Sequence, residues 1–263
     1  MLTSLQNPLI KQMRKLHRAK ERREQQLFLL EGTHLLETAC AANYPLETVC
    51  CTAAWQEQHP HLWEQCMQRS QRSELVSPEV LQAIATTIQP DGVVATAQRV
   101  ALHPPMVEAL RLGIALETLQ DPGNLGTVIR TAAAAGVDGL WLSQDSVDLD
   151  HPKVLRASAG QWFRLPMYVS SSLGTEVQQF RDQGIQIIAT LPTASLTYWQ
   201  ADLTRPTLIL MGNEGAGLSS ELASLAEVAV KIPLAIGVES LNVAIASALM
   251  LYEAQRQREV LKA

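Results

Sequence analysis

The chain has 263 residues, of which 47% are hydrophobic, 5% aromatic and 18% charged. This length predicts one medium-sized domain with a smaller partner, and the composition is typical of globular proteins rather than of disordered or membrane proteins. No run of about 18 apolar residues could cross a bilayer, and the N-terminus lacks the long apolar core of a secretory signal. We therefore expect a cytoplasmic protein that does not use a membrane.

Charge is distributed unevenly along the chain. The net charge is −5, which by itself argues weakly against a nucleic-acid partner, because phosphate binding draws on clustered Lys and Arg. Residues 1–23 nevertheless carry a local charge of +6, which leaves −11 elsewhere. Two interpretations of this segment are open, a solvated helix face and an arm that contacts phosphates. Its basic residues are Lys11, Arg14, Lys15, Arg18, Lys20, Arg22 and Arg23.

The first part of the chain predicts a small α/β unit, with a helix over 30–44, a strand over 46–54 and a closing strand over 91–100. Adjacent prolines within residues 101–113 then predict a linker. We place a domain boundary near Pro105, which divides the chain into residues 1–105 and 106–263. The cysteines have neither metal-ligand nor disulfide spacing, so we expect reduced, structural thiols and no metal. They are Cys40, Cys50, Cys51 and Cys66.

From residue 114 onward the pattern alternates between strand and helix. Strands are predicted over 114–120 and 137–143 and helices over 124–136 and 151–160, and the alternation continues to residue 233. This arrangement predicts an α/β fold with a mainly parallel sheet and helices on both faces. The final helix, over 240–260, begins with small and apolar residues, so we expect it to be buried in the core or against a second subunit.

Three glycine- or turn-rich segments stand where a predicted strand ends and a helix begins, the edge at which open α/β sheets bind ligands. The first is "LQDPGNLGTVIRTA", in which Asn124 is placed to cap the next helix. Arg130 lies two turns further on, and its side chain points back towards the same edge. Alternatively, Asn124 is only a helix cap and Arg130 only a surface residue.

The second segment, "LMGNEGAGLS", surrounds Glu214 with glycines that allow a close approach of backbone to a ligand. The alternative is that Glu214 merely caps the helix that starts near Ser219. The third segment, "IPLAIGVESLNVA", places Ser240 and Asn242 at the start of the last helix, where Ser240 could again be only a cap. None of the three has the spacing G-x-G-x-x-G or G-x-x-x-x-G-K-[ST], which disfavours a nicotinamide or triphosphate site.

Taken together, three longer stretches resemble the three ordered motifs of the SpoU/TrmH family of RNA ribose 2′-O-methyltransferases, within the SPOUT superfamily. They are "DPGNLGTVIRTAAAAG", "LILMGNEGAGLS" and "IPLAIGVESLNVAIASALMLYEAQRQ". The stretches "SLQNPLIKQMRKL" and "FLLEGTHLLETA" are similar to the N-terminal substrate-binding domain of members that act on ribosomal RNA. The resemblance therefore implies an RNA substrate-binding domain over 1–105 and a SPOUT catalytic domain over 106–263.

The resemblance also implies S-adenosylmethionine as methyl donor and an RNA ribose 2′-hydroxyl as acceptor, with ribosomal RNA favoured over transfer RNA. It implies a homodimer whose active site draws on both subunits, and a deep trefoil knot in the catalytic domain. Topology rules alone would not lead to a knot. The competing interpretations are a non-catalytic RNA-binding protein that keeps the fold, and an oxidoreductase, which would need the missing phosphate-binding fingerprint.

Residue roles follow by matching positions to the family motifs. Cofactor contacts match Gly212, Ile232 and Leu241. Catalytic and substrate-handling positions match Asn124, Arg130, Glu214, Ser240 and Asn242. RNA-facing positions match Arg156 and Ser158. The basic N-terminal segment, taken from its charge rather than from a motif, supplies the candidate phosphate contacts Lys11, Arg14, Lys15, Arg18, Arg22 and Arg23. We expect Arg130 to contact the target hydroxyl or its neighbouring phosphate, with Asn124 and Glu214 holding the guanidinium.

Overall fold

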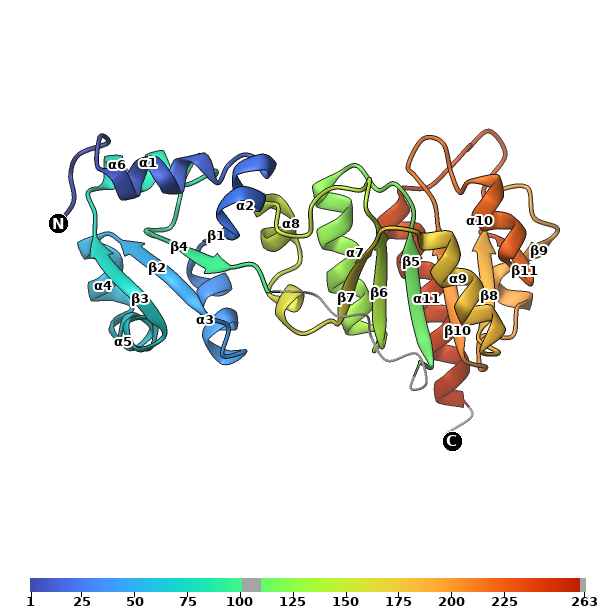
Figure 1. Cartoon of the computed structure of the whole chain (residues 1–263). Coiled ribbons are helices and arrows are strands. Elements are labelled where there is room, and N and C mark those ends of the chain that lie inside the picture. Colours follow the sequence, from blue (N-terminus) through green and yellow to red (C-terminus); the bar gives the residue numbers. More distant parts are fainter. Residues whose placement is uncertain (101–109, 261–263) are drawn as a thin grey trace. The chain divides into compact units, whose positions relative to one another are not determined.

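The computed structural model describes residues 1–100 and 110–260, which form two compact units (Figure 1). Unit 1 comprises residues 1–100 and 148–163, and unit 2 comprises residues 110–147 and 164–260. The expected boundary near Pro105 lies outside the described residues. The segment 148–163, which stands between two strands of unit 2 in the sequence, makes its contacts with unit 1.

Unit 1 is built on a four-stranded mixed sheet in the order β1-β4-β2-β3. The central pair β4 and β2 is antiparallel, β1 is antiparallel to β4, and β3 is parallel to β2. The strands are β1 (Leu27–Glu31), β2 (Leu46–Cys51), β3 (Ser70–Leu75) and β4 (Val93–Gln98). The helices are α1 (Pro8–Lys15), α2 (Ala19–Gln25), α3 (Thr33–Ala41), α4 (Ala53–Gln58), α5 (Pro60–Arg69), α6 (Pro78–Ile84), α8 (Pro152–Ala157) and the short η2 (Gln161–Phe163).

The helix predicted over 30–44 begins later than expected. Leu30 and Glu31 instead complete strand β1, and Gly32, with φ +101°, turns the chain into α3. Glycine adopts that conformation without steric cost. Strand β1 was not predicted from the sequence, because the apolar run of β1 directly precedes the helical pattern of α3.

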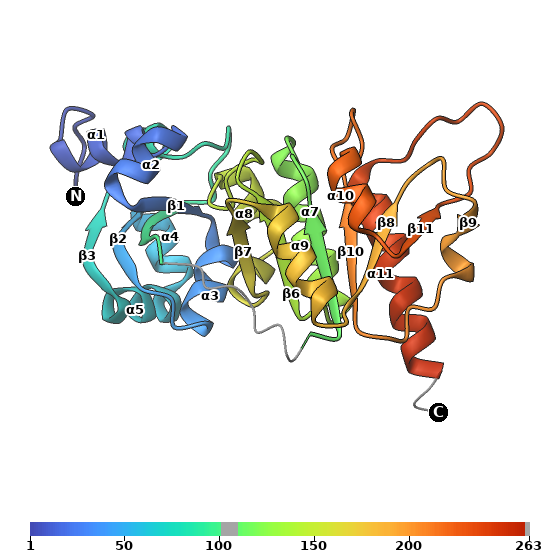
Figure 2. The ribbon, with the colours of Figure 1, turned by 45° about the vertical axis from the view of Figure 1, so that its right-hand side comes forward.

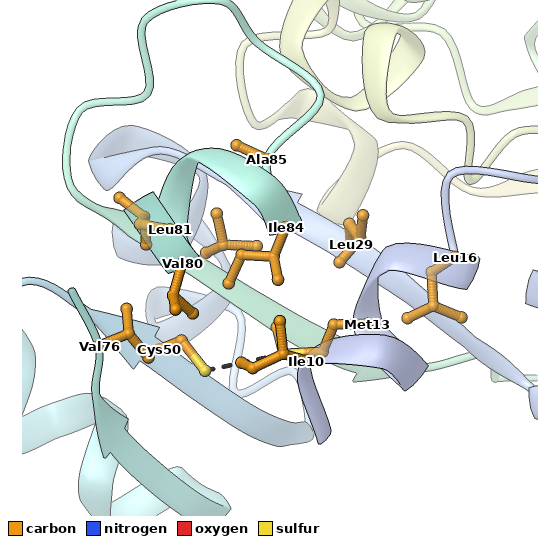
Figure 3. Close-up of a cluster of buried hydrophobic side chains, with 11 residues drawn as sticks. Ile10, Met13, Leu16, Leu29, Cys50, Val76, Val80, Leu81, Ile84 and Ala85 are labelled. Carbon is orange, nitrogen blue, oxygen red and sulfur yellow. Dashed lines mark hydrogen bonds between the residues drawn. The ribbon is translucent and has the colours of Figure 1, made fainter. Parts of the chain in front are cut away.

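Figure 3 shows the core between α1, α6 and the sheet of unit 1. Ile10 and Met13 recur at helical spacing on α1 and are buried against Val80 and Ile84 of α6. The side chain of Asn7 caps α1 by accepting a hydrogen bond from the backbone N–H of Leu9 over 2.9 Å. The apolar face of α1 therefore points inward, and its basic residues remain on the surface.

Unit 2 contains a seven-stranded sheet in which every pairing is parallel. Its order is β7-β6-β5-β10-β8-β11-β9, so β10 lies between two strands that precede it in the sequence. The strands are β5 (Leu112–Leu116), β6 (Gly139–Ser143), β7 (Met167–Ser170), β8 (Gln186–Thr190), β9 (Leu196–Thr197), β10 (Thr207–Met211) and β11 (Val228–Lys231).

Helices cover both faces of this sheet, which confirms the prediction (Figure 2). On one face α9 (Leu173–Asp182) and α10 (Ser220–Leu225) cover an apolar cluster that includes Trp141 and Phe180, whose rings lie 4.9 Å apart. On the other face α7 (Pro122–Ala134) packs against α11 (Val243–Val260). The short η3 (Tyr198–Gln200) contacts α11. The trefoil knot stays a prediction.

Helix α11 starts at Val243 rather than at residue 240. Its residues Met250 and Leu251 are fully buried, whereas Ile245 and Tyr252 are about half exposed, at 52% and 50%. The helix therefore contributes to the core of unit 2 and also presents apolar side chains on the surface of a single chain. Over residues 1–100 and 110–260, no helix has the length and apolar character needed to cross a bilayer.

Candidate functional site

The carboxyl ends of β8, β10 and β11 surround a cavity of about 440 Å³. Parallel strands end at a common edge, which is where open α/β sheets bind ligands. All three predicted cofactor residues, Gly212, Ile232 and Leu241, line this cavity, and so do Glu214 and Ser240. The rest of the lining is Thr190, Leu191, Pro192, Met211, Asn213, Gly215, Ala216, Gly217, Leu218, Leu234, Glu239, Val243 and Ala246.

Glu214 joins the loop after β10 to the start of α7. Its carboxylate accepts hydrogen bonds from the side-chain amide of Asn124 over 3.1 Å and from the backbone N–H groups of Gln120 and Asp121, each over 3.3 Å. Partial burial acts to raise the pKa of Glu214, but these hydrogen bonds outweigh it, and its pKa lies below the ordinary value. Glu214 is therefore held as a carboxylate.

Asn124 links this carboxylate to the third motif. Its side-chain oxygen accepts a hydrogen bond from the amide of Asn242 over 2.9 Å. The side-chain oxygen of Asn242 in turn accepts one from the backbone N–H of Ala244 over 2.9 Å. Glu214, Asn124 and Asn242 thus form one hydrogen-bonded chain that connects the three segments singled out in the sequence.

The helix caps differ from those expected. Asp121, not Asn124, is the N-cap of α7, and its carboxylate accepts a hydrogen bond from the backbone N–H of Asn124 over 2.9 Å. Asn242 rather than Ser240 caps α11 through its bond to Ala244. The expectation that Asn124 serves as a cap is therefore wrong, and its side chain is used between Glu214 and Asn242.

Glu214 does not cap α10 either. Ser219 is the N-cap of that helix, and its hydroxyl accepts a hydrogen bond from the backbone N–H of Leu222. The backbone N–H of Ser219 donates to Glu117 over 2.7 Å. Glu117 follows β5 and was missed in the sequence, although an acidic residue at the end of a parallel strand is a signal that could have identified it.

Asn213 is a second residue that sequence reasoning missed. Its side-chain oxygen accepts hydrogen bonds from the backbone N–H groups of Gly215 and Ala216 over 2.8 and 2.9 Å, and its amide donates to the carbonyl of Thr118 over 2.7 Å. Asn213 therefore fixes the conformation of the loop that carries Glu214. The signal for it is the Asn two residues before a Gly, which is typical of a side chain that bonds its own turn.

The conformation of the loop after β10 requires glycine at position 212. A Cβ on Gly212 would overlap the backbone of Gly217 and Leu218. Asn213 and Gly217 exchange two backbone hydrogen bonds of 3.0 Å across the loop, and Gly217 has φ +72°. Gly212 thus allows two backbone segments of the loop to pack closely at the wall of the cavity.

Arg130 and Ser240 are both exposed. Arg130 forms no hydrogen bond or ion pair with the parts of the chain that the structure describes. The expected support of its guanidinium by Asn124 and Glu214 is not formed, since those two side chains bind each other. Ser240 lines the cavity.

Two of the residues predicted to face RNA are buried in unit 1. Arg22 is 1% exposed and forms ion pairs with Asp148 over 2.9 Å and Asp150 over 3.0 Å. Ser158 is fully buried, and its hydroxyl donates to the carbonyl of Leu155 over 2.8 Å. Neither side chain can reach an RNA molecule, so both predictions are corrected.

The remaining basic residues differ in whether their side chains are bound by other side chains of the protein. Arg156 donates to Glu31 over 3.0 Å and to Thr86 over 2.8 Å, and Arg23 pairs with Asp148 over 2.6 Å while its side chain stays 61% exposed. The other four are exposed along α1 and the turn that follows it: Lys11, Arg14, Lys15 and Arg18. The charge run of the N-terminus is thus partly structural and partly a free basic surface.

Comparison with known proteins identifies the family. Residues 111–252 match the SpoU rRNA Methylase family, and residues 7–95 match the MRM3-like substrate binding domain. The chain belongs to the SpoU rRNA methylase family. The regions matched by the two families agree with the resemblance noted in the sequence.

Relatives named as RNA methyltransferases align with this chain over different lengths. An uncharacterized tRNA/rRNA methyltransferase of Synechocystis sp. is 51% identical over 98% of this chain and 94% of its own length. The 23S rRNA (guanosine(2553)-2′-O)-methyltransferase RlmP of Bacillus subtilis is 32% identical over 95% and 97%. The tRNA (guanosine(18)-2′-O)-methyltransferase of Escherichia coli is 37% identical, but over only 56% of this chain.

Solved structures of SpoU methyltransferases share the fold. The AdoMet-bound rRNA methyltransferase from Sinorhizobium meliloti has a TM-score of 0.87, 32% sequence identity and coverage of 97% of both chains. The SpoU methyltransferase AviRb from Streptomyces viridochromogenes in complex with AdoMet has a TM-score of 0.86 and 28% identity, and covers 97% of this chain and 99% of that chain. The α/β fold and the smaller N-terminal unit are thus those of SpoU methyltransferases.

Proposed function

We propose that this chain transfers a methyl group from S-adenosylmethionine to a ribose 2′-hydroxyl of RNA. The observation that carries the proposal is the hydrogen-bonded chain of Glu214, Asn124 and Asn242, which brings three family motifs together beside one cavity. The carboxylate of Glu214, held by three hydrogen-bond donors at this edge, supports the catalytic interpretation.

The cavity fits the cofactor in size and chemistry. Its volume of about 440 Å³ lies within the range of small-molecule pockets. The hydroxyl of Thr190, on its wall, is shielded from solvent and has no hydrogen-bond partner within residues 1–100 and 110–260. When bound, the sulfonium supplies an electrophilic methyl group. Gly212, Ile232 and Leu241, which all line the cavity, would hold the cofactor.

The task left to the protein is to align a weak nucleophile, and such positioning can lower a barrier by about 7 to 11 kcal/mol. We assign this task to Arg130, whose guanidinium is free to bind the target ribose or its neighbouring phosphate with a planar fork of donors. Arginine stays protonated in proteins, so Arg130 positions the hydroxyl rather than removing its proton. Ser240 supplies a polar group at the cavity itself, whose lining does not include Arg130.

Ribosomal RNA is our preferred substrate. The match of residues 7–95 to a substrate-binding domain supports this choice, as does a ribosomal RNA enzyme that aligns over 95% of the chain. The transfer RNA enzyme of Escherichia coli aligns over little more than half. In unit 1, the exposed residues Lys11, Arg14, Lys15 and Arg18 would contact RNA phosphates.

A homodimer in the cytoplasm completes the proposal. Trp199 of η3 is 58% exposed, and Ile245 and Tyr252 of α11 are about half exposed, so unit 2 presents an apolar surface that a second copy could cover. Size-exclusion chromatography with light scattering tests this element separately. A monomer at micromolar concentration would contradict it.

The decisive experiment measures transfer of tritiated methyl from S-adenosylmethionine to total RNA from cells that lack this protein. We expect label in ribosomal RNA, mapped to a ribose 2′-O position and abolished in Arg130→Ala. Label in transfer RNA would overturn the substrate assignment alone. Cofactor binding without label in either RNA would favour the non-catalytic interpretation.

A further inference from the structure

The wall of the cavity carries charge of only one sign. Among the described residues, its lining contains two glutamates, Glu214 and Glu239, and no lysine, arginine or histidine. A wall of this kind opposes ligands that carry phosphates and attracts a cation. Of two ligands with the same shape, the negatively charged wall therefore favours the one with the more positive charge.

The two glutamates are in different states. Glu214 accepts three hydrogen bonds, so its charge is already engaged by protein donors. Glu239 is exposed and forms no hydrogen bond or ion pair with the described part of the chain. Of the two, Glu239 has the carboxylate that is available to a ligand.

The backbone places Glu239 at the cavity. It lies in the segment between β11 and α11, directly after a turn in which the backbone N–H of Val238 donates to the carbonyl of Ala235 over 3.1 Å. Gly237, with φ +86°, makes this turn possible. The next two residues, Ser240 and Leu241, line the cavity together with Glu239.

We propose that Glu239 is a specificity-determining residue that makes the cavity prefer the sulfonium cofactor over its thioether product. The inference rests on the proposed function. In that reaction the bond from sulfur to methyl breaks, its electron pair stays on sulfur, and the methyl forms a bond to the ribose oxygen, whose proton passes to solvent water. The cofactor thus loses one positive charge and keeps nearly the same shape, so a charge on the wall is what can tell the two apart.

The expected size of the effect follows from Coulomb's law. Two opposite unit charges about 5 to 6 Å apart, screened as in water, change an affinity about three- to fourfold. Because Glu239 is exposed, this interaction should weaken as salt screens it. The product, S-adenosylhomocysteine, has no sulfonium charge. Its affinity should therefore change little when the charge of Glu239 is removed or when salt is added.

The test compares dissociation constants of S-adenosylmethionine and S-adenosylhomocysteine by isothermal titration calorimetry. The proteins are the wild type, Glu239→Gln and Glu239→Lys, with Glu227→Gln as a control, since Glu227 is exposed in unit 2 and does not line the cavity. Each is measured at roughly 50 mM and 500 mM salt, which spans weak and strong screening. Thermal unfolding of every variant checks that it is folded.

We expect Glu239→Gln to weaken binding of S-adenosylmethionine about three- to fourfold at low salt and Glu239→Lys to weaken it further, with the product unaffected in Glu239→Gln. The loss should shrink at high salt, and Glu227→Gln should bind like the wild type. Equal losses for both ligands, or no loss, would overturn the inference while leaving the proposed function standing. A wild type that binds neither ligand would overturn the proposed function as well.

Discussion

The side-chain amide of Asn124 donates a hydrogen bond to the carboxylate of Glu214 over 3.1 Å, although 90 residues separate the two in the sequence. This contact, with the one from Asn242 to Asn124, gives the edge of the sheet a defined geometry before any ligand binds. Preorganised polar groups of this kind need no rearrangement when the reacting groups arrive.

Glu214→Gln should lower methyl transfer sharply. The new amide nitrogen would face donors from Gln120, Asp121 and Asn124 where the carboxylate now accepts. Losing hydrogen bonds to a charged group costs about 1.5 to 3 kcal/mol, which predicts a roughly ten- to hundredfold loss of kcat/KM. Steady-state kinetics measure this, and Glu227→Gln serves as the control. Wild-type turnover in Glu214→Gln would show that the carboxylate is not needed for activity.

The lowered pKa of Glu214 predicts a pH dependence of stability. Because its folded-state pKa lies below that of the unfolded chain, its stabilising contribution is present above the ordinary glutamate pKa of about 4.3 and is lost as the pH falls through the folded value. Urea unfolding between roughly pH 3 and pH 7 should show a wild-type advantage over Glu214→Gln that disappears at the acid end. A difference between the two proteins that is constant over this range would contradict the assignment.

Gly212→Ala should disrupt the loop, whereas Gly215→Ala should be tolerated. A Cβ at position 212 would overlap the backbone of Gly217 and Leu218, but one at position 215 would meet only the side-chain oxygen of Asn213 at 3.6 Å. We expect Gly212→Ala to weaken binding of S-adenosylmethionine at least about tenfold, since a displaced loop changes the cavity wall. Calorimetry on both variants measures this, and equal affinities would show that the loop can yield.

Arg22→Met should destabilise unit 1 far more than Arg23→Met. Arg22 is buried, and its removal takes from Asp148 and Asp150 the partner that they share. Asp148 keeps its pair with Arg23 and Asp150 keeps its pair with Arg99 over 2.5 Å, so the loss should be at most about 3 to 5 kcal/mol, the cost of a broken buried pair. Arg23 is mostly exposed, and its pair with Asp148 should contribute about 0 to 1 kcal/mol. Urea unfolding compares the two free energies. Similar values would mean that Arg23 and Arg99 compensate for the loss of Arg22.

Replacement of Lys11, Arg14 and Lys15 by glutamine should weaken RNA binding in a salt-dependent way. Each is exposed, and each phosphate contact that is lost should reduce the slope of log affinity against log salt by about 0.7 to 0.9. Fluorescence anisotropy over a salt series with a ribosomal RNA fragment measures the slope. A slope equal to that of the wild type would make this surface a plain solvated helix face.

Local patterns in the sequence were sufficient to predict the alternating strands and helices and the edge at which the three motifs meet, because parallel strands place their carboxyl ends together. They could not predict that β10 enters the sheet between β5 and β8, since strand order depends on long-range packing. The cap of α7 could have been assigned, because Pro122 favours the first helical position and so points to Asp121. The burial of Arg22 depends on partners 126 and 128 residues away.

The placement of residues 148–163 in unit 1 has a consequence for how the chain is made. Phe28 and Tyr44 complete their aromatic contacts with Trp162 and Phe163, and Arg22 meets its aspartates, only within this late segment. During synthesis the ribosome has therefore already produced β5 and β6 of the other unit before unit 1 can finish folding. The synthesis of the two units is thus interleaved, and unit 1 cannot complete its fold before part of unit 2 has been synthesised.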